Sequence, residues 1–114
     1  MNKYSVRDVC SSSRAQELVQ KYGSPLFVYN ELIVRDKATS LLKAAEGFVV
    51  KYALKANTNS VIVKLLRSIG ISQVDVVSPG EIYKAIQCGY KPENIMYTEN
   101  FISAEEMDYA LKAG

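Results

Sequence analysis

The chain has 114 residues, of which 48% are hydrophobic and 23% are charged. Its 14 lysine and arginine residues are scattered among 12 acidic residues, which gives a net charge of +2. This mixed pattern indicates no nucleic-acid partner, and no apolar stretch approaches the ~20 residues of a membrane span. The N-terminus from Met1 to Ser5 lacks the apolar core of a signal peptide, so we expect a cytoplasmic protein.

Cysteine and histidine usage disfavours several kinds of site. The two cysteines, Cys10 and Cys88, match no zinc or redox spacing and are expected to be free buried thiols. The chain has no histidine, so zinc sites and serine-triad catalysis lack their usual residues. We therefore expect no metal site.

The first predicted elements lie before residue 46. Serines 11–13 can cap a helix that continues through Leu18 and Val19 and is closed by Gly23. Pro25 then starts a short predicted strand over residues 26–29. A second helix is predicted over residues 31–45, and it leads into a repeating pattern.

Residues 48–114 repeat a strand-then-helix pattern three times. The first strand is predicted over residues 48–54, and the helix after it is stopped by Gly70. The second unit has a strand over residues 73–77 and a helix over residues 79–88. The third has a strand over residues 94–98 and a helix that starts with a Ser-Ala-Glu-Glu capping box at residues 103–106 and ends at Gly114. This alternation predicts neighbouring parallel strands linked by helices.

Lys55 is the most informative residue because it ends the first predicted strand, just before a polar Asn-Thr-Asn turn. In α/β proteins, ligands and catalytic groups gather at the carboxyl ends of parallel strands. Lys51 shares the same predicted face but lies four residues from that end, so it is the weaker candidate. A solvated lysine at a strand end is the alternative interpretation of the pattern.

Three segments resemble one enzyme family. Residues 52–59 read Tyr-Ala-Leu-Lys-Ala-Asn-Thr-Asn and are similar to the Schiff-base lysine motif of the pyridoxal phosphate (PLP) decarboxylases of the alanine racemase-like barrel fold, above all the diaminopimelate decarboxylases. Residues 74–82 resemble that family's second barrel strand and the start of its next helix, and residues 23–29 resemble the stretch before the barrel. The lysine motif is less similar to alanine racemases or eukaryotic-type ornithine decarboxylases. The resemblance runs from about residue 22 onward.

The resemblance implies an α/β fold that is a partial TIM (β/α)8 barrel, about three βα units of a fold that needs roughly 250 residues. It assigns residues 1–30 to an amino-terminal arm of the family's second, β-rich domain and residues 31–114 to the truncated start of the PLP-binding barrel. It implies PLP as cofactor, a homodimer, and a PLP-dependent carboxy-lyase that converts meso-diaminopimelate to L-lysine and CO2. Ornithine, arginine or lysine are alternative substrates, and a non-catalytic fragment or PLP-binding relative is an alternative role. We expect the 114-residue chain alone to be inactive.

The resemblance also implies three site residues. Lys55 would hold PLP covalently. Asp75 interrupts an apolar strand, so its carboxylate would need a partner if buried, and the resemblance implies a place beside Lys55 and the cofactor. Glu81 has two compatible interpretations, as a cofactor-binding residue and as part of a capping box that begins at Ser78 with Pro79 in the first helical position.

Overall fold

The computed structural model describes residues 4–114, and a boundary after Lys37 divides the chain into two compact units. The terminal segment that argues against a signal peptide falls partly on Met1–Lys3, outside the described residues. The family-based division at residue 30 stays a prediction, because it concerns a second domain whose other strands are not in this chain.

The first unit contains α1 (Val6–Val9), α2 (Ser12–Tyr22) and the start of α3 (Glu31–Ala44). The two longer helices were predicted. The Ser11 hydroxyl caps α2 by accepting a hydrogen bond from the Arg14 amide, and the side-chain oxygen of Asn30 accepts from the amides at the start of α3. These caps depend on nearby sequence alone, which is why the pattern located both helices.

The strand predicted over residues 26–29 is wrong, because this segment has no regular secondary structure. A strand needs a partner for its backbone hydrogen bonds, and no described segment pairs with this one. Its large side chains are left open to solvent, with Phe27 87% exposed and Tyr29 52% exposed.

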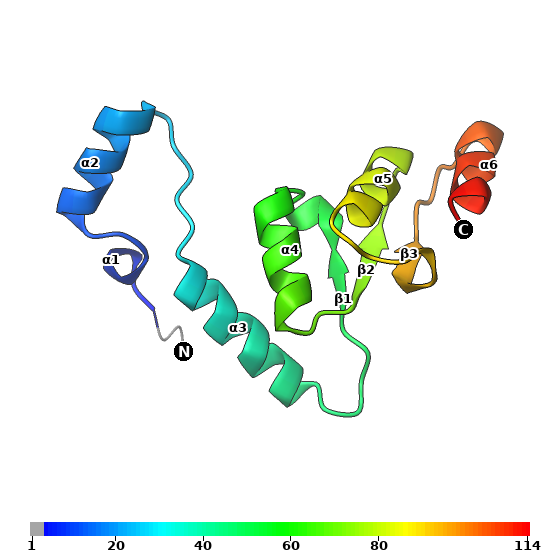
Figure 1. Cartoon of the computed structure of the whole chain (residues 1–114), viewed down its shortest axis with the longest axis horizontal. Coiled ribbons are helices and arrows are strands. Elements are labelled where there is room, and N and C mark those ends of the chain that lie inside the picture. Colours follow the sequence, from blue (N-terminus) through cyan, green and yellow to red (C-terminus); the bar gives the residue numbers. More distant parts are fainter. Residues whose placement is uncertain (1–3) are drawn as a thin grey trace. The chain divides into compact units, whose positions relative to one another are not determined.

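The second unit is an α/β arrangement around a small parallel sheet (Figure 1). Its three strands lie in the order β1-β2-β3, and both pairings are parallel, as the sequence predicts. In chain order the elements are β1 (Lys51–Ala53), the 3-10 helix η1 (Leu54–Ala56), α4 (Ser60–Ile69), β2 (Gln73–Val76), α5 (Pro79–Gln87), the 3-10 helix η2 (Pro92–Asn94), β3 (Ile95–Tyr97) and α6 (Ala104–Ala113).

The first strand is shorter at both ends than residues 48–54, which corrects the prediction. Pairing with β2 begins at Lys51, opposite Gln73, and ends at Ala53, opposite Asp75. Phe48 and Val49 precede the paired residues and are 82% and 66% exposed. Their β-forming side chains produced the longer prediction, but side-chain propensity does not provide a partner strand.

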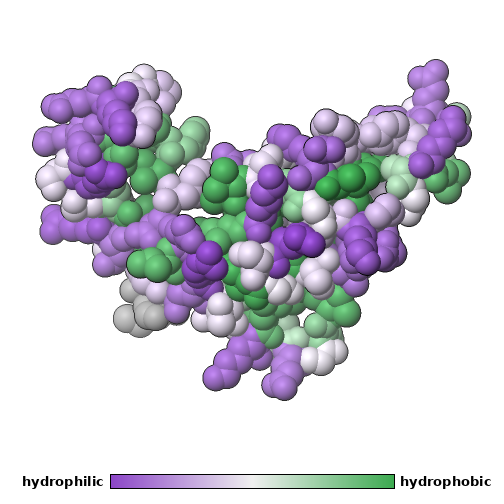
Figure 2. Space-filling model, in the orientation of Figure 1, coloured by the Kyte–Doolittle hydropathy of each residue, from purple (hydrophilic) through white to green (hydrophobic). Residues whose placement is uncertain are grey.

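The hydrophobic core lies on one face of the sheet. Val74 and Val76 are fully buried there, together with Leu54 from η1 and Val63 from α4. Side chains of a strand alternate between faces, so Asp75 points to the other face, where it is half-buried. Figure 2 shows apolar side chains left open to solvent between hydrophilic ones, and the described chain therefore covers only part of its apolar surface.

The ends of the helices follow the predicted signals. Gly70 ends α4 with a φ of 118°, a left-handed conformation that glycine adopts at little cost. At α6, the Ser103 hydroxyl accepts from the Glu106 amide and the Glu106 carboxylate accepts from the Ser103 amide. The predicted capping box is confirmed.

The structure bears on two expectations from composition, the state of the cysteines and the lack of a membrane span. Cys88 is buried and free as predicted, whereas Cys10 is free but only half-buried, which corrects that part of the prediction. Among the described residues, no helix combines the length and the apolar character that a membrane crossing needs.

Candidate active site

Lys55 lies in the middle of η1, the single 3-10 turn that directly follows β1. The residue before it, Leu54, is completely buried in the core, while the side chain of Lys55 is exposed. Within residues 4–114 the Lys55 amine has no hydrogen-bond or ion-pair partner. The buried neighbour fixes the backbone and leaves the amine available for chemistry.

The position of Lys55 partly corrects the sequence prediction. The residue stands just past the carboxyl end of a parallel strand, as expected, but in a 3-10 turn and not in the strand itself. The two-residue alternation of a strand therefore does not relate it to Lys51. Lys51 instead hydrogen-bonds through its ammonium to the side-chain oxygen of Gln73 at the start of β2, which assigns it a role in strand pairing.

The polar run after Lys55 builds a tight turn. The Asn57 amide donates to the Leu54 carbonyl at 3.0 Å, and the Tyr52 hydroxyl donates to the Asn57 carbonyl at 3.1 Å. Further on, the Asn59 side-chain oxygen accepts from the Val61 amide at 2.9 Å and so caps α4. Lys55 thus sits in a turn whose two ends are joined by hydrogen bonds.

Asp75 occupies the centre of the neighbouring strand. It is opposite Ala53 in β1 and Met96 in β3, and its Oδ1 atom accepts a 2.6 Å hydrogen bond from the Thr98 hydroxyl. The expected partner therefore exists, but the carboxylate is half-buried and not enclosed as predicted. The face of the sheet that carries Asp75 has no covering helix in the described chain, so water reaches this group.

Thr98 is a residue that the sequence analysis missed. It follows β3, and its amide donates to the Val76 carbonyl at 3.0 Å, which continues the pairing with β2. The same alternation that places Asp75 and Met96 on one face also places Thr98 there. Grouping Thr98 with Asp75 also requires the register that sets Met96 opposite Asp75, which the sequence alone does not give.

Glu81 closes the amino-terminal end of α5. Its amide donates to the Ser78 hydroxyl at 3.2 Å, and its carboxylate oxygen Oε2 accepts from the Val77 amide at 2.8 Å. The capping interpretation is confirmed with one change, because the carboxylate reaches Val77 and not the cap residue Ser78 itself. A role of Glu81 at a cofactor stays a prediction.

The three predicted residues lie at one edge of the sheet without touching one another. Lys55 is two residues beyond Ala53, the partner of Asp75, and η1 contacts β2. Glu81 follows the carboxyl end of β2. In the described chain no hydrogen bond or ion pair joins Lys55 to Asp75 or Glu81. The arrangement places one amine and two carboxylates around the ends of adjacent parallel strands.

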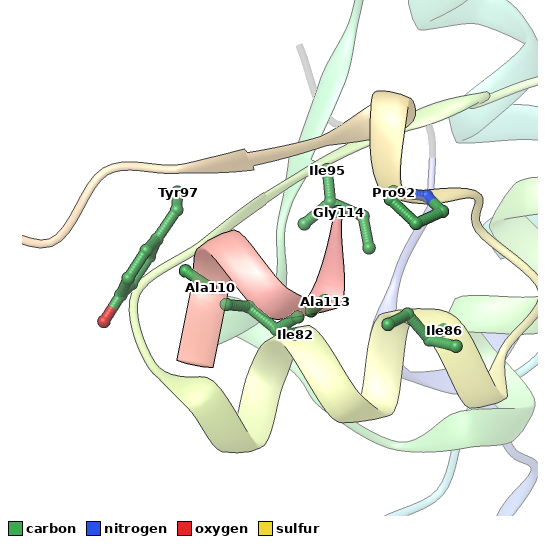
Figure 3. A pocket seen from close by; sticks show the side chains of 8 residues that line it. All are labelled: Ile82, Ile86, Pro92, Ile95, Tyr97, Ala110, Ala113 and Gly114. Atoms are coloured by element: carbon green, nitrogen blue, oxygen red, sulfur yellow. The ribbon is translucent and has the colours of Figure 1, made fainter. Parts of the chain in front are cut away.

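An apolar pocket lies elsewhere, between α5, β3 and α6 (Figure 3). It is on the helix-covered side of the sheet. Tyr97 lines it, and the buried hydroxyl of Tyr97 has no hydrogen-bond partner among residues 4–114. Burial raises the pKa of Tyr97, with Glu106 and Glu99 adding to the effect. The remaining lining is Ile82, Ile86, Pro92, Ile95, Ala110, Ala113 and Gly114. None of the three candidate residues reaches this pocket, so it is separate from the site around Lys55.

The fold and site together are those of an α/β protein that presents an exposed lysine at the carboxyl edge of a parallel sheet. The chain belongs to the pyridoxal-dependent decarboxylase family, because its residues 32–114 match the pyridoxal binding domain of that family. The cofactor of this domain is pyridoxal phosphate.

Curated relatives agree with this assignment. The chain is 42% identical over 104 residues to a diaminopimelate decarboxylase of Methanothermobacter thermautotrophicus, covering 88% of this chain and 24% of that protein. It is 37% identical over 99 residues to a diaminopimelate decarboxylase of Bacillus subtilis, covering 83% and 22%. The chain thus spans about a quarter of the length of the curated relatives it matches.

Solved structures give the same fold. A diaminopimelate decarboxylase from M. jannaschi superposes with a TM-score of 0.78 at 33% identity, over 87% of this chain and 24% of that one. A lysine/ornithine decarboxylase from Vibrio vulnificus superposes with a TM-score of 0.83 at 22% identity, over 96% and 29%. At that lower identity the second match shows the fold alone.

The residues around Lys55 fit this cofactor. The aldehyde of PLP needs an amine that can be approached, and Lys55 is exposed with no carboxylate paired to it in the described structure. Asp75 and Thr98 supply polar groups on the adjacent strands. The arrangement offers an accessible amine, a carboxylate and a hydroxyl near the ends of neighbouring strands.

Proposed function

We propose that this chain supplies the cofactor lysine of a PLP-dependent decarboxylase that converts meso-diaminopimelate to L-lysine and CO2. The observation that carries the proposal is the exposed, unpaired amine of Lys55 on a rigid turn at the carboxyl edge of the sheet. The choice of substrate is supported by relatives that are named diaminopimelate decarboxylases at up to 42% identity.

Each residue has a proposed task at this edge. Lys55 would hold PLP through its Nζ atom, and the buried side chain of Leu54 anchors the backbone from which Lys55 extends. When bound, the cofactor supplies an electron sink for the electron pair left by the departing CO2. Asp75, oriented by Thr98, accepts a hydrogen bond or a proton from the group at Lys55. Glu81 holds the start of α5 through the Val77 amide, and we propose that its charge also acts on the cofactor.

The proposal extends to architecture and assembly. The three parallel strands and their helices are the first βα units of a (β/α)8 barrel, and the face that carries Asp75 is the interior of that barrel. The first unit of the chain contributes to a second, β-rich domain. The working enzyme is a cytoplasmic homodimer.

Turnover by the protein expressed from its intact gene tests the proposal. With PLP present, release of CO2 should be fastest from meso-diaminopimelate and much slower from L-lysine, L-ornithine and L-arginine. Lys55→Ala should remove the activity. Preference for L-ornithine, L-arginine or L-lysine would replace meso-diaminopimelate with one of these alternative substrates, and PLP binding without CO2 release from any of them would favour a non-catalytic relative.

A further inference from the structure

A side chain from α5 reaches the loop that follows Lys55. The ammonium of Lys84 donates a 3.2 Å hydrogen bond to the hydroxyl of Thr58, 26 residues earlier in the sequence. Thr58 lies between Asn57, where the Lys55 turn ends, and Asn59, which caps α4. The bond therefore joins the second βα unit to the loop that carries the reactive lysine of the first.

The bonding of Lys84 is unusual for a lysine on a helix. Its side chain is half-buried, and in the described chain it has no carboxylate partner. By comparison, the contact from Lys112 to Asp108 is an exposed ion pair within one helix. A surface ion pair contributes little to stability, whereas a half-buried ammonium bonded to a neutral hydroxyl across two elements fixes their relative position.

A second hydrogen bond joins the ends of the same turn. The Tyr52 hydroxyl, one residue before the end of β1, donates to the Asn57 carbonyl at 3.1 Å. Lys55 is thus enclosed between a contact from its own strand and a contact from α5, while its amine stays exposed. Neither hydrogen bond involves an atom of Lys55.

We propose that Lys84 is a positioning residue for Lys55: by holding Thr58, it clamps the loop after η1 and keeps the Lys55 amine in the orientation that PLP requires. We call the Lys84–Thr58 and Tyr52–Asn57 contacts the loop clamp. The inference rests on the proposed function, because the orientation of the Lys55 amine matters only if Lys55 binds PLP. Lys84 itself does not contact the reacting atoms.

Variants that keep most of the side-chain volume separate the clamp from general stability. Lys84→Met keeps most of the apolar stem of the side chain but removes its donors, and the isosteric Thr58→Val removes the hydroxyl that accepts. Lys84→Arg and Thr58→Ser retain a donor and a hydroxyl and serve as rescue variants. Lys64→Met on α4 is the matched control, because Lys64 is exposed and its ammonium has no hydrogen bond or ion pair with a described residue.

Two measurements apply to the protein expressed from its intact gene. The first is amide hydrogen exchange at Asn57, whose amide donates to Leu54 within the turn. The second is the PLP concentration that half-saturates Lys55, found by borohydride reduction and peptide mapping. We expect Lys84→Met and Thr58→Val to speed the exchange and raise this concentration by roughly three- to tenfold, where tenfold corresponds to about 1.4 kcal/mol.

The pattern across variants decides the inference. The double variant of Lys84→Met and Thr58→Val should show the effect of one single variant, because both remove the same bond, and the rescue variants and Lys64→Met should stay within about twofold of the unchanged protein. If neither Lys84→Met nor Thr58→Val changes the amide exchange at Asn57 or the half-saturating PLP concentration, the clamp is overturned. Absence of label at Lys55 in the unchanged protein would overturn the proposed function instead, and the exchange at Asn57 would then decide the clamp alone.

Discussion

The hydroxyl of Thr98 donates a 2.6 Å hydrogen bond to Oδ1 of Asp75 and thereby ties the end of β3 to the centre of β2. Oδ2 of the carboxylate is left for another donor, on the face of the sheet that carries no helix. The orientation of Asp75 is therefore set by a residue that lies 23 positions away in the sequence.

Removing this hydroxyl should loosen Asp75. We expect Thr98→Val to lower the free energy of unfolding by ~0.5–1 kcal/mol, at the low end for a hydrogen bond because Thr98 is exposed, and to weaken PLP binding. Urea denaturation and PLP titration measure the two effects. Thr98→Ser keeps the hydroxyl and is the control. Equal PLP affinity in Thr98→Val and the unchanged protein would show that Thr98 does not orient Asp75.

Substitutions at Glu81 separate its two interpretations. Glu81→Gln keeps an oxygen that can accept from the Val77 amide, so stability should change by less than ~0.5 kcal/mol. Glu81→Ala removes the cap and should cost about 1 kcal/mol. Thermal denaturation measures both. A fall in PLP affinity for Glu81→Gln at unchanged stability is expected from a charge that faces the cofactor, and an unchanged affinity would leave Glu81 with the cap alone.

The anchor of the Lys55 turn is Leu54. Because its side chain is fully buried, Leu54→Ala should lower the free energy of unfolding by ~2–5 kcal/mol and weaken PLP binding as η1 shifts. Leu111→Ala, at a site that is 74% exposed, is the matched control and should change little. A loss under ~1 kcal/mol for Leu54→Ala would mean that η1 is not held by the core.

Because of Tyr90, the stability of the fold should depend on pH in the alkaline range. Burial raises the pKa of Tyr90 to about 12, against a lowering effect of the Arg67 guanidinium, and its hydroxyl donates to the Ile71 carbonyl at 2.9 Å. Since the pKa of an unfolded tyrosine is about 10, the stabilisation is complete below pH ~10 and is lost as pH rises towards 12.

Ultraviolet titration of the tyrosines checks this prediction. One of the eight tyrosines should ionise last, near pH 12, and the melting temperature should fall between pH ~10 and that value. Tyr90→Phe should remove the last step. A titration that is complete by pH ~11 in the unchanged, folded protein would contradict the buried environment of Tyr90.

Local signals made much of the second unit predictable. The caps at Ser78 and Ser103 and the stop at Gly70 lie within a few residues of the helix ends they determine. Lys55 could be proposed from the sequence because its motif is continuous, and its role stays a prediction. The order and direction of the strands followed from the spacing of the βα units.

Features that depend on pairing could not be predicted in the same way. The strand at residues 26–29 and the first residues of the strand at 48–54 have β-forming side chains but no partner. The bond from Thr98 to Asp75 requires the register of β2 with β3, which places Val76 opposite Tyr97. The 3-10 turn at Lys55 depends on Leu54 entering the core, a tertiary contact.

The covalent site of PLP tests the central claim most directly. The protein expressed from its intact gene is loaded with PLP, reduced with borohydride and digested, and the labelled peptide is sequenced. We expect the label on Lys55, its loss in Lys55→Ala, and its retention in Lys51→Ala, whose effect should fall on strand pairing through Gln73. Label on Lys51, or on no lysine between Phe48 and Asn59, would contradict the assignment of Lys55 as the cofactor lysine.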